Sequence, residues 1–272
     1  MTDSQPGTAA AGWEANAEQT DARLLPVTHW FIEQTDVQAG TVVLDLAAGP
    51  GGVGFHFAEL VGESGRVLST DLAPAMLEAA QRIGTRRGLS NVDYRLIDAQ
   101  DMDLDDDSVD IVVCRSGFML MPDPLAALRE SKRVLRPGGD LVFSVFGPPE
   151  RNPFVGVPPR VFTELGHLSP PPPGTPGVFA LSDPELIRAL LDEADFDPRT
   201  VEAIHLEGGF PNADSIVDRI LEMNAHIGPI HRDLPSSDQA AARRALREGF
   251  DAYRQSDGTY VLPAQMWGAH AR

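Results

Sequence analysis

The chain has 272 residues, 42% hydrophobic and 23% charged, a composition typical of a globular protein. Its formal net charge of −18 repels phosphate backbones, and no basic stripe is present, so nucleic acids and anionic membranes are not expected partners. No apolar run reaches the roughly 18 residues that a membrane span needs. The polar N-terminus has neither the basic nor the apolar region of a secretory signal, so we expect a cytoplasmic protein.

Short apolar runs alternate with helix-like stretches from residue 41 to about residue 147. The runs are rich in Val, Ile and Leu, which is typical of strands buried on both faces of a parallel sheet. They cover residues 41–46, 65–70, 92–97, 109–114 and 140–146. Helices are predicted between them at 53–61, 74–87 and 124–135. The last helix is expected to end at a turn, Arg136-Pro137-Gly138-Gly139. This alternation predicts right-handed βαβ units and a doubly wound sheet.

The sequence changes character after Gly147. Proline and glycine are so dense in residues 169–177 that no regular element is expected there. A capping box at Ser182 predicts a helix that runs through Leu191. Further helices are predicted at 214–223 and 237–253, and strands at 201–206 and 260–269.

These elements suggest a single α/β domain with a helical cover. We expect residues 1–40 to form an N-terminal helical segment and residues 41–147 to form the core. Residues 148–272 would complete the sheet and carry an inserted cover, at 148–180 and 208–258.

The segment after the first predicted strand has the features of a ligand-binding loop. The strand ends on Asp45 and leads through the small residues Ala47–Gly52 into a helix. Small residues let the backbone approach a ligand closely, and the helix N-terminus offers free N–H groups. The Lys-Ser/Thr pair of a phosphate-binding P-loop is missing. Because Gly49-Pro-Gly51-Gly-Val-Gly54 matches the NAD fingerprint literally, an NAD-dependent oxidoreductase remains an alternative.

Two further acids end the next two predicted strands. Asp71 follows the second strand, where a carboxylate can accept both ribose hydroxyls of NAD or of S-adenosylmethionine (SAM). Asp98 follows the third strand, where a carboxylate can accept from the adenine amine, a contact that the NAD fingerprint does not require. With Asp45, three acids lie at the strand ends where open α/β sheets bind ligands. The series favours SAM over NAD.

The chain resembles the class I SAM-dependent methyltransferases, particularly the ubiquinone/menaquinone-biosynthesis-like group that acts on small molecules. The resembling segments are VVLDLAAGPGG (42–52), VLSTDLAPAML (67–77), YRLIDAQDMDLDDDSVDIVVCRSGFML (94–120) and LRESKRVLRPGGDLVFSVF (128–146). The resemblance implies a Rossmann-like α/β fold, doubly wound and mostly parallel with an antiparallel last strand. It also implies an enzyme that takes SAM as cofactor and releases S-adenosylhomocysteine (SAH).

The family's cofactor contacts can be placed on this sequence by resemblance. The implied residues are Asp45, Ala47, Gly49 and Gly51 at the methionine end, Asp71 at the ribose, Leu72, Met76, Asp98 and Ala99 at the adenine, and Arg115 and Ser116 near the methionine moiety and the acceptor. Pro50 departs from the frequent threonine of the family, which removes a hydroxyl and an N–H.

The acceptor side of the site is defined less well. His226 and His231 are candidate general bases. Apolar residues in the predicted cover suggest a small, largely apolar acceptor methylated on O, N or C. A SAM-binding fold without methyl transfer is the other alternative. The single cysteine, Cys114, is expected to be a small buried strand residue, and no metal site is predicted.

Overall fold

The computed structural model describes residues 12–172, 174–224 and 226–272, so residues 1–11 of the predicted N-terminal segment lie outside the described residues. The chain forms two compact units. The first comprises Met1–Phe146, Pro176–Ile204 and Met266–Arg272, and the second comprises Gly147–Thr175 and His205–Gln265.

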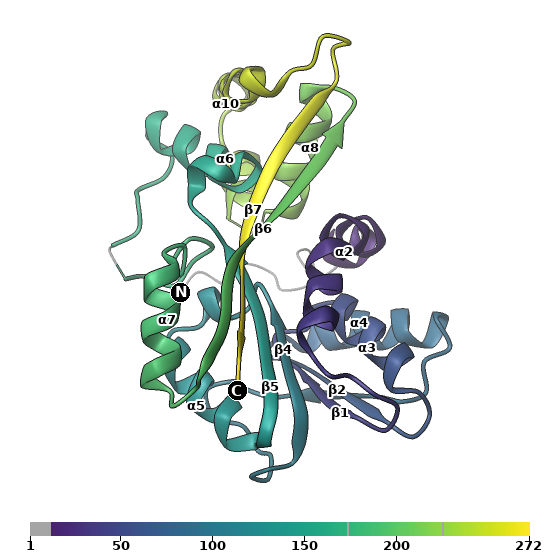
Figure 1. Cartoon of the computed structure of the whole chain (residues 1–272). Coiled ribbons are helices and arrows are strands. Elements are labelled where there is room, and N and C mark those ends of the chain that lie inside the picture. Colours follow the sequence, from purple (N-terminus) through teal and green to yellow (C-terminus); the bar gives the residue numbers. More distant parts are fainter. Residues whose placement is uncertain (1–11, 173, 225) are drawn as a thin grey trace. The chain divides into compact units, whose positions relative to one another are not determined.

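Most of a seven-stranded sheet with the order β3-β2-β1-β4-β5-β7-β6 lies in the first unit (Figure 1), while residues 205–210 of β6 and 260–265 of β7 belong to the second. The strands are β1 (Val42–Asp45), β2 (Arg66–Asp71), β3 (Val92–Leu96), β4 (Val109–Arg115), β5 (Leu135–Phe146), β6 (Pro198–Phe210) and β7 (Tyr260–Ala271). The first five strands pair in parallel, and β7 pairs with β5 in the antiparallel sense. The predicted fold class, a doubly wound sheet with an antiparallel last strand, is confirmed.

Helices cover both faces of this sheet (Figure 1). One face carries α2 (Ala17–Gln34), α3 (Gly52–Val61) and α4 (Pro74–Arg86), and the other carries α5 (Pro124–Val134) and α7 (Pro184–Glu193). On α4 the buried residues Leu77, Ala80 and Ile83 recur every three residues, which places them on one side of the helix. That spacing explains why α4 was predictable from the sequence.

The core of the first unit lies between the sheet and α5 and α7. Leu44, Val112 and Leu141 of three adjacent strands are fully buried there. Burying an aliphatic side chain of this size stabilises the fold by roughly 1.5–3 kcal/mol. Cys114 is also fully buried, and burial raises the pKa of its thiol to about 12, which confirms the prediction of an inert strand residue.

The second unit has a core of its own. It contains α6 (Pro153–Glu164), α8 (Ala213–Met223), α9 (Ile227–Asp233) and α10 (Ser236–Phe250). The short 3-10 helices η2 (Pro149–Arg151) and η3 (Asp251–Tyr253) also belong to it, whereas η1 (Phe118–Leu120) belongs to the first unit. Its buried side chains pack with one another, and among them are Val157, Phe162, Phe210, Ile216, Ile220 and Ile227. Core formation therefore explains the apolar residues from which an apolar acceptor pocket was predicted.

The predicted turn at Arg136–Gly139 is wrong. These four residues belong to β5. Val109 of β4 pairs with Leu135 and Ile111 pairs with Asp140, so residues 136–139 of β5 lie opposite the single residue Asp110 of β4. Gly138 has φ +82°, a left-handed conformation that glycine adopts without strain. The preceding helix α5 does end just before these residues, at Val134, but the proline and glycines mark an irregularity inside a strand rather than a turn between elements.

Two predictions about the second half of the chain also need correction, and one helix was missed. The cap of α7 is Asp183, whose carboxylate accepts the Glu185 N–H at 2.9 Å, and not Ser182. Pro184 occupies the first helical position and has no N–H, so the cap is the residue directly before it. The predicted helix 237–253 ends at Phe250 and continues as η3. Helix α6, with Pro158 and Pro159 inside it, was not predicted, because internal proline normally argues against a helix.

Candidate cofactor site

The loop between β1 and α3 has a backbone that only small residues adopt easily. Ala47, Gly49 and Gly51 have φ values of +52°, +55° and +97°. A Cβ on Gly51 would overlap the ring of Phe55, and one on Gly52 would lie 2.5 Å from Nη2 of Arg115. Glycine at positions 51 and 52 is therefore a steric requirement, and the small residues of the loop leave its backbone open to a ligand.

Asp45 lies at the C-terminal end of β1 and is almost completely buried. Its Oδ2 accepts the N–H of Gly54 at 2.9 Å, which ties the strand end to the first turn of α3. Burial raises the pKa of this carboxyl to about 7, although Arg115 and the Gly54 N–H both oppose the shift. A carboxyl with such a pKa can respond to a cation placed beside it by ionising.

Asp71, the last residue of β2, is hydrogen-bonded to the loop between β1 and α3. Its Oδ2 accepts from Gly49 N and its Oδ1 from Ala73 N, each at 2.9 Å. Each carboxylate oxygen can accept more than one hydrogen bond, so both remain able to accept from a pair of ribose hydroxyls. The next residue, Leu72, is 61% exposed, and Met76 on the first turn of α4 is half-buried. An exposed apolar side chain beside such a carboxylate suits the face of a purine.

Asp98 follows β3, and Gln100 fixes its carboxylate. Oδ1 of Asp98 accepts from the backbone N of Gln100 at 2.9 Å and from its Nε2 at 3.1 Å. The Ala99 side chain is buried in the core, so only its backbone is available to a ligand.

Arg115, at the end of β4, belongs to a buried polar cluster that the sequence did not reveal. Its Nη1 donates to Thr28 Oγ1 at 2.9 Å and to Asp21 Oδ1 at 3.2 Å, both from α2. Oδ2 of Asp21 lies 2.9 Å from Nε2 of His56 on α3. Burial lowers the pKa of Arg115, and Asp21 partly opposes this shift. These contacts hold α2 against the strand ends beside the loop.

Ser116, the next residue, has φ +66°, which is strained for a residue other than glycine. Its hydroxyl is buried and has no hydrogen-bond partner among the described residues. Buried hydroxyls are normally paired. A strained backbone and an unpaired donor at a strand end are features typical of a ligand-binding site.

These residues fit an adenosyl ligand with a methionine tail. The C-terminal ends of the parallel strands bring together a loop of small residues, carboxylates at the ends of β1 and β2, an exposed leucine and the unpaired Ser116 hydroxyl. Direct contact of each predicted residue with SAM stays a prediction. Nothing in the sequence distinguishes Asp21, Thr28 and His56 as members of this site.

The two candidate bases belong to the second unit. His226 is exposed at the start of α9, and its backbone N–H donates to Asn224 Oδ1. His231 is buried, and its Nε2 has no hydrogen-bond partner among the described residues. Burial lowers the pKa of His231, with smaller contributions from Arg243 and Arg232, so neutral imidazole is favoured. A catalytic role for either histidine stays a prediction.

The sequence of the chain is similar to those of known methyltransferases. Residues 37–153 match the model of a methyltransferase domain. The ubiquinone/menaquinone biosynthesis C-methyltransferase of Francisella philomiragia is 28% identical over 186 residues, 67% of this chain and 72% of that protein. Its counterpart in Cellvibrio japonicus is 36% identical over 119 residues, so this match spans only 48% of that relative and 43% of this chain.

Solved structures show the same fold. A SAM-dependent methyltransferase from Aquifex aeolicus has a TM-score of 0.53 and 20% identity, covering 69% of this chain and 90% of that one. The YcgJ protein from Bacillus subtilis has a TM-score of 0.61 and 19% identity, covering 90% and 96%. The cyclase SpnF also matches, with a TM-score of 0.56, 20% identity and coverage of 89% and 79%. The fold alone thus does not establish methyl transfer.

The fold, the loop and the match over residues 37–153 are those of a class I, Rossmann-like SAM-dependent methyltransferase domain. Within that class, the chain is similar to the ubiquinone/menaquinone C-methyltransferases. Both parts of the predicted resemblance are therefore confirmed. No helix in the described part of the chain is long and apolar enough to cross a membrane.

Proposed function

We propose that this protein transfers the methyl group of SAM to a carbon, oxygen or nitrogen atom of a small, largely apolar acceptor. The observation that carries the proposal is the placement of Asp45 and Asp71 around a loop of small residues, in a chain whose residues 37–153 match a methyltransferase domain. The names of the relatives favour carbon methylation. The same names support an apolar acceptor. The apolar residues of the second unit do not support it, because they pack into that unit's own core.

The chain's own residues supply binding and orientation. Asp71 accepts hydrogen bonds from the ribose hydroxyls. Leu72 and Met76 contact the adenine ring, and Asp98 accepts a hydrogen bond from the adenine amino group. The backbone of the loop and Asp45 receive the methionine part. When bound, SAM supplies a methyl group already activated on a sulfonium, so the protein needs mainly to hold the acceptor in line.

Carbon acceptors must lose a proton, and His231 is the candidate base that this proposal favours. Burial favours its neutral form, which can accept a proton, whereas His226 is exposed to water. In this proposal His231 removes the proton and His226 is a surface residue.

Calorimetric titration tests the cofactor. We expect SAM and SAH to bind and NAD not to bind. Asp71→Asn should weaken SAH binding roughly 10- to 100-fold, because two hydrogen bonds to a charged acceptor lose their charge. Asp93→Asn removes the same charge from β3, where Asp93 pairs with Arg66 at 3.5 Å, and should leave binding unchanged.

The acceptor requires a separate measurement. Phenols, quinols, amines and acids would be incubated with the protein and SAM and analysed by mass spectrometry for the gain of one methyl group. Binding of NAD in place of SAM would refute the proposal. Binding of SAM without methylation of any acceptor class would favour the alternative of a SAM-binding fold with another role.

A further inference from the structure

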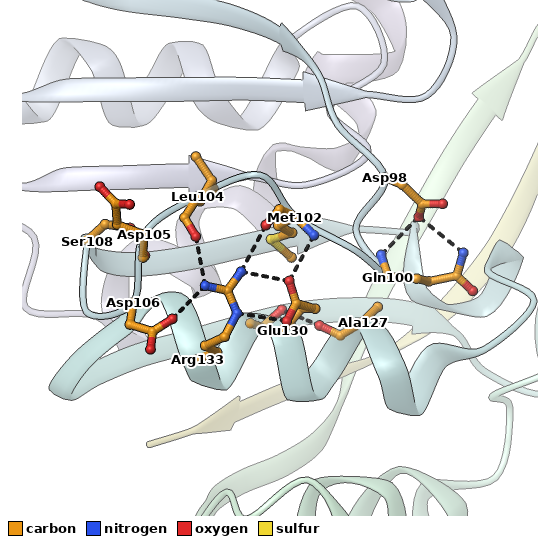
Figure 2. A network of polar contacts seen from close by, with 11 residues as sticks. Asp98, Gln100, Met102, Leu104, Asp105, Asp106, Ser108, Ala127, Glu130 and Arg133 are labelled. Atoms are coloured by element: carbon orange, nitrogen blue, oxygen red, sulfur yellow. Dashed lines mark hydrogen bonds and ion pairs between the residues drawn. The ribbon is translucent and has the colours of Figure 1, made fainter.

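The guanidinium of Arg133 on α5 is the centre of a polar network that Figure 2 shows from close by. Its Nε and Nη2 donate to the two carboxylate oxygens of Glu130 at 2.8 and 2.7 Å. Its Nη2 and Nη1 also donate to the backbone carbonyls of Met102 and Leu104, at 2.9 and 2.7 Å. A fifth bond goes to Asp106 Oδ1 at 2.7 Å. One side chain therefore holds several points of the segment between β3 and β4.

Glu130 completes the attachment from the same helix. Its Oε2 accepts the Met102 N–H at 2.8 Å, so Met102 is bound through both its N–H and its C=O. The hydrogen bonds from Arg133 lower the pKa of Glu130, which keeps this carboxylate charged at neutral pH. Fork-shaped, charge-assisted contacts of this kind fix direction as well as distance.

Gln100 attaches the beginning of the same segment. Its backbone N and its Nε2 donate to Asp98 Oδ1, as Figure 2 shows, and its Oε1 accepts the Asp123 N–H at 2.7 Å where α5 begins. Both donors of Gln100 meet the same oxygen of Asp98. The other oxygen, Oδ2, has no hydrogen-bond partner among the residues that the structure describes.

Helix α5 thus holds the 98–108 segment at both ends, through Asp123 at its start and through Glu130 and Arg133 in its last turns. The side chains of Ala99 and Met102 in this segment, 7% and 4% exposed, are buried in the core of the first unit. A segment fixed in this way cannot slide along the helix without breaking charge-assisted bonds.

We propose that Gln100 and the Glu130–Arg133 pair are positioning residues that set the base specificity of the cofactor site. They hold Asp98 so that one carboxylate oxygen is bound by Gln100 and the other is left to accept from the 6-amino group of the purine. This inference rests on the proposed function, because Asp98 has a base to recognise only if an adenosyl cofactor binds at these strand ends.

The test compares SAH with an SAH analogue in which hydrogen replaces the 6-amino group of the purine, by calorimetry. The wild-type protein should bind SAH roughly 10- to 100-fold more tightly, as expected for a hydrogen bond to a carboxylate. In Gln100→Ala and Arg133→Lys this ratio should fall at least about threefold, toward the value in Asp98→Ala. Arg129→Ala is the matched control, because Arg129 lies on α5 but bonds to Glu193.

A structural role alone would weaken both ligands equally. If the ratio in Gln100→Ala and Arg133→Lys equals that of the wild type, in variants whose thermal unfolding shows that they are folded, the inference is wrong. A wild-type ratio of one overturns it as well, because Asp98 would then not recognise the amine. If the wild-type protein binds neither ligand, the proposed function itself fails, and this outcome is distinct from the other two.

Discussion

At the scale of single residues, Asp45 shows how burial sets the charge of a site. A carboxyl with an ordinary pKa of 3.8 has a pKa of about 7 here, because desolvation outweighs the attraction of Arg115. The folded protein therefore binds a proton between these pH values that the unfolded chain does not. The contribution of Asp45 to the free energy of unfolding therefore falls as pH rises from about 4 to about 7, and it stays constant above pH 7.

Asp45→Asn should remove this penalty. An amide oxygen can still accept the Gly54 N–H, but no charge has to be buried. We expect the free energy of unfolding to rise by about 2–4 kcal/mol at pH 8 and to change little at pH 4.5. Urea unfolding at both pH values measures this difference. Equal gains at the two pH values, or a loss at pH 8, would contradict the assignment.

Residue-level prediction succeeded where the signal is local. Asp45, Asp71 and Asp98 each follow an apolar run, so their place at the strand ends could be predicted from a few neighbouring residues. Asp21 could not be predicted, because its contacts reach His56, 35 residues away, and Arg115, 94 residues away. Nothing in the helix around Asp21 distinguishes it from a surface acid.

At the scale of elements, the pairing of β5 with β7 includes a buried charge cluster. Oδ1 of Asp140 on β5 lies 2.8 Å from His270 Nε2 on β7 and accepts from Arg272 Nε at 2.7 Å. Burial alone would raise the pKa of Asp140, but these two partners hold it below its ordinary value. The cluster therefore adds stability at neutral pH that is lost as pH falls below about 4.

Asp140→Ala should be strongly destabilising, because His270 is only 9% exposed and would lose its partner. We expect a loss of about 2–4 kcal/mol in the free energy of unfolding at pH 7. Arg129→Ala, which breaks an exposed pair with Glu193, should cost less than about 1 kcal/mol. Denaturant unfolding of the two variants gives the comparison, and similar losses in both would refute a special role for Asp140.

Element prediction was accurate for the parallel strands and weaker where proline intervenes. Every residue of the run Val109–Cys114 except Asp110 is apolar and buried, as expected for a strand that is covered on both faces. The segment Arg136–Gly139 has the composition of a turn, yet strand pairing on both sides keeps it inside β5. Tertiary pairing overrode local preference there, and α6 shows the same effect for Pro158 and Pro159.

At the scale of the whole molecule, acidic charge is in large excess. A net charge of −18 favours states that spread the charges apart, which opposes the compact fold. The exposed Arg–acid pairs each stabilise the fold by only roughly 0–1 kcal/mol. Salt that screens these pairs therefore removes less stability than it adds by screening the repulsion among the excess acids.

Added salt should therefore stabilise this protein. Between 0.01 M and 0.1 M NaCl the Debye length falls from about 30 Å to about 10 Å, and we expect Tm to rise by about 2–5 °C at pH 7. Calorimetric scans in NaCl and in KCl would measure the shift, which should be the same in both if screening is the cause. A fall in Tm would show that the attractive pairs dominate.

The place of β7 has a consequence for biosynthesis. This strand lies between β5 and β6, although the ribosome makes both of those strands before it. Until residues 266–272 leave the exit tunnel, β5 has an unpaired edge of backbone N–H and C=O groups, and β6 has no neighbour in the sheet. Such edges can pair with other nascent chains. Chaperones that hold the growing chain would have to protect this gap until translation of β7 closes it.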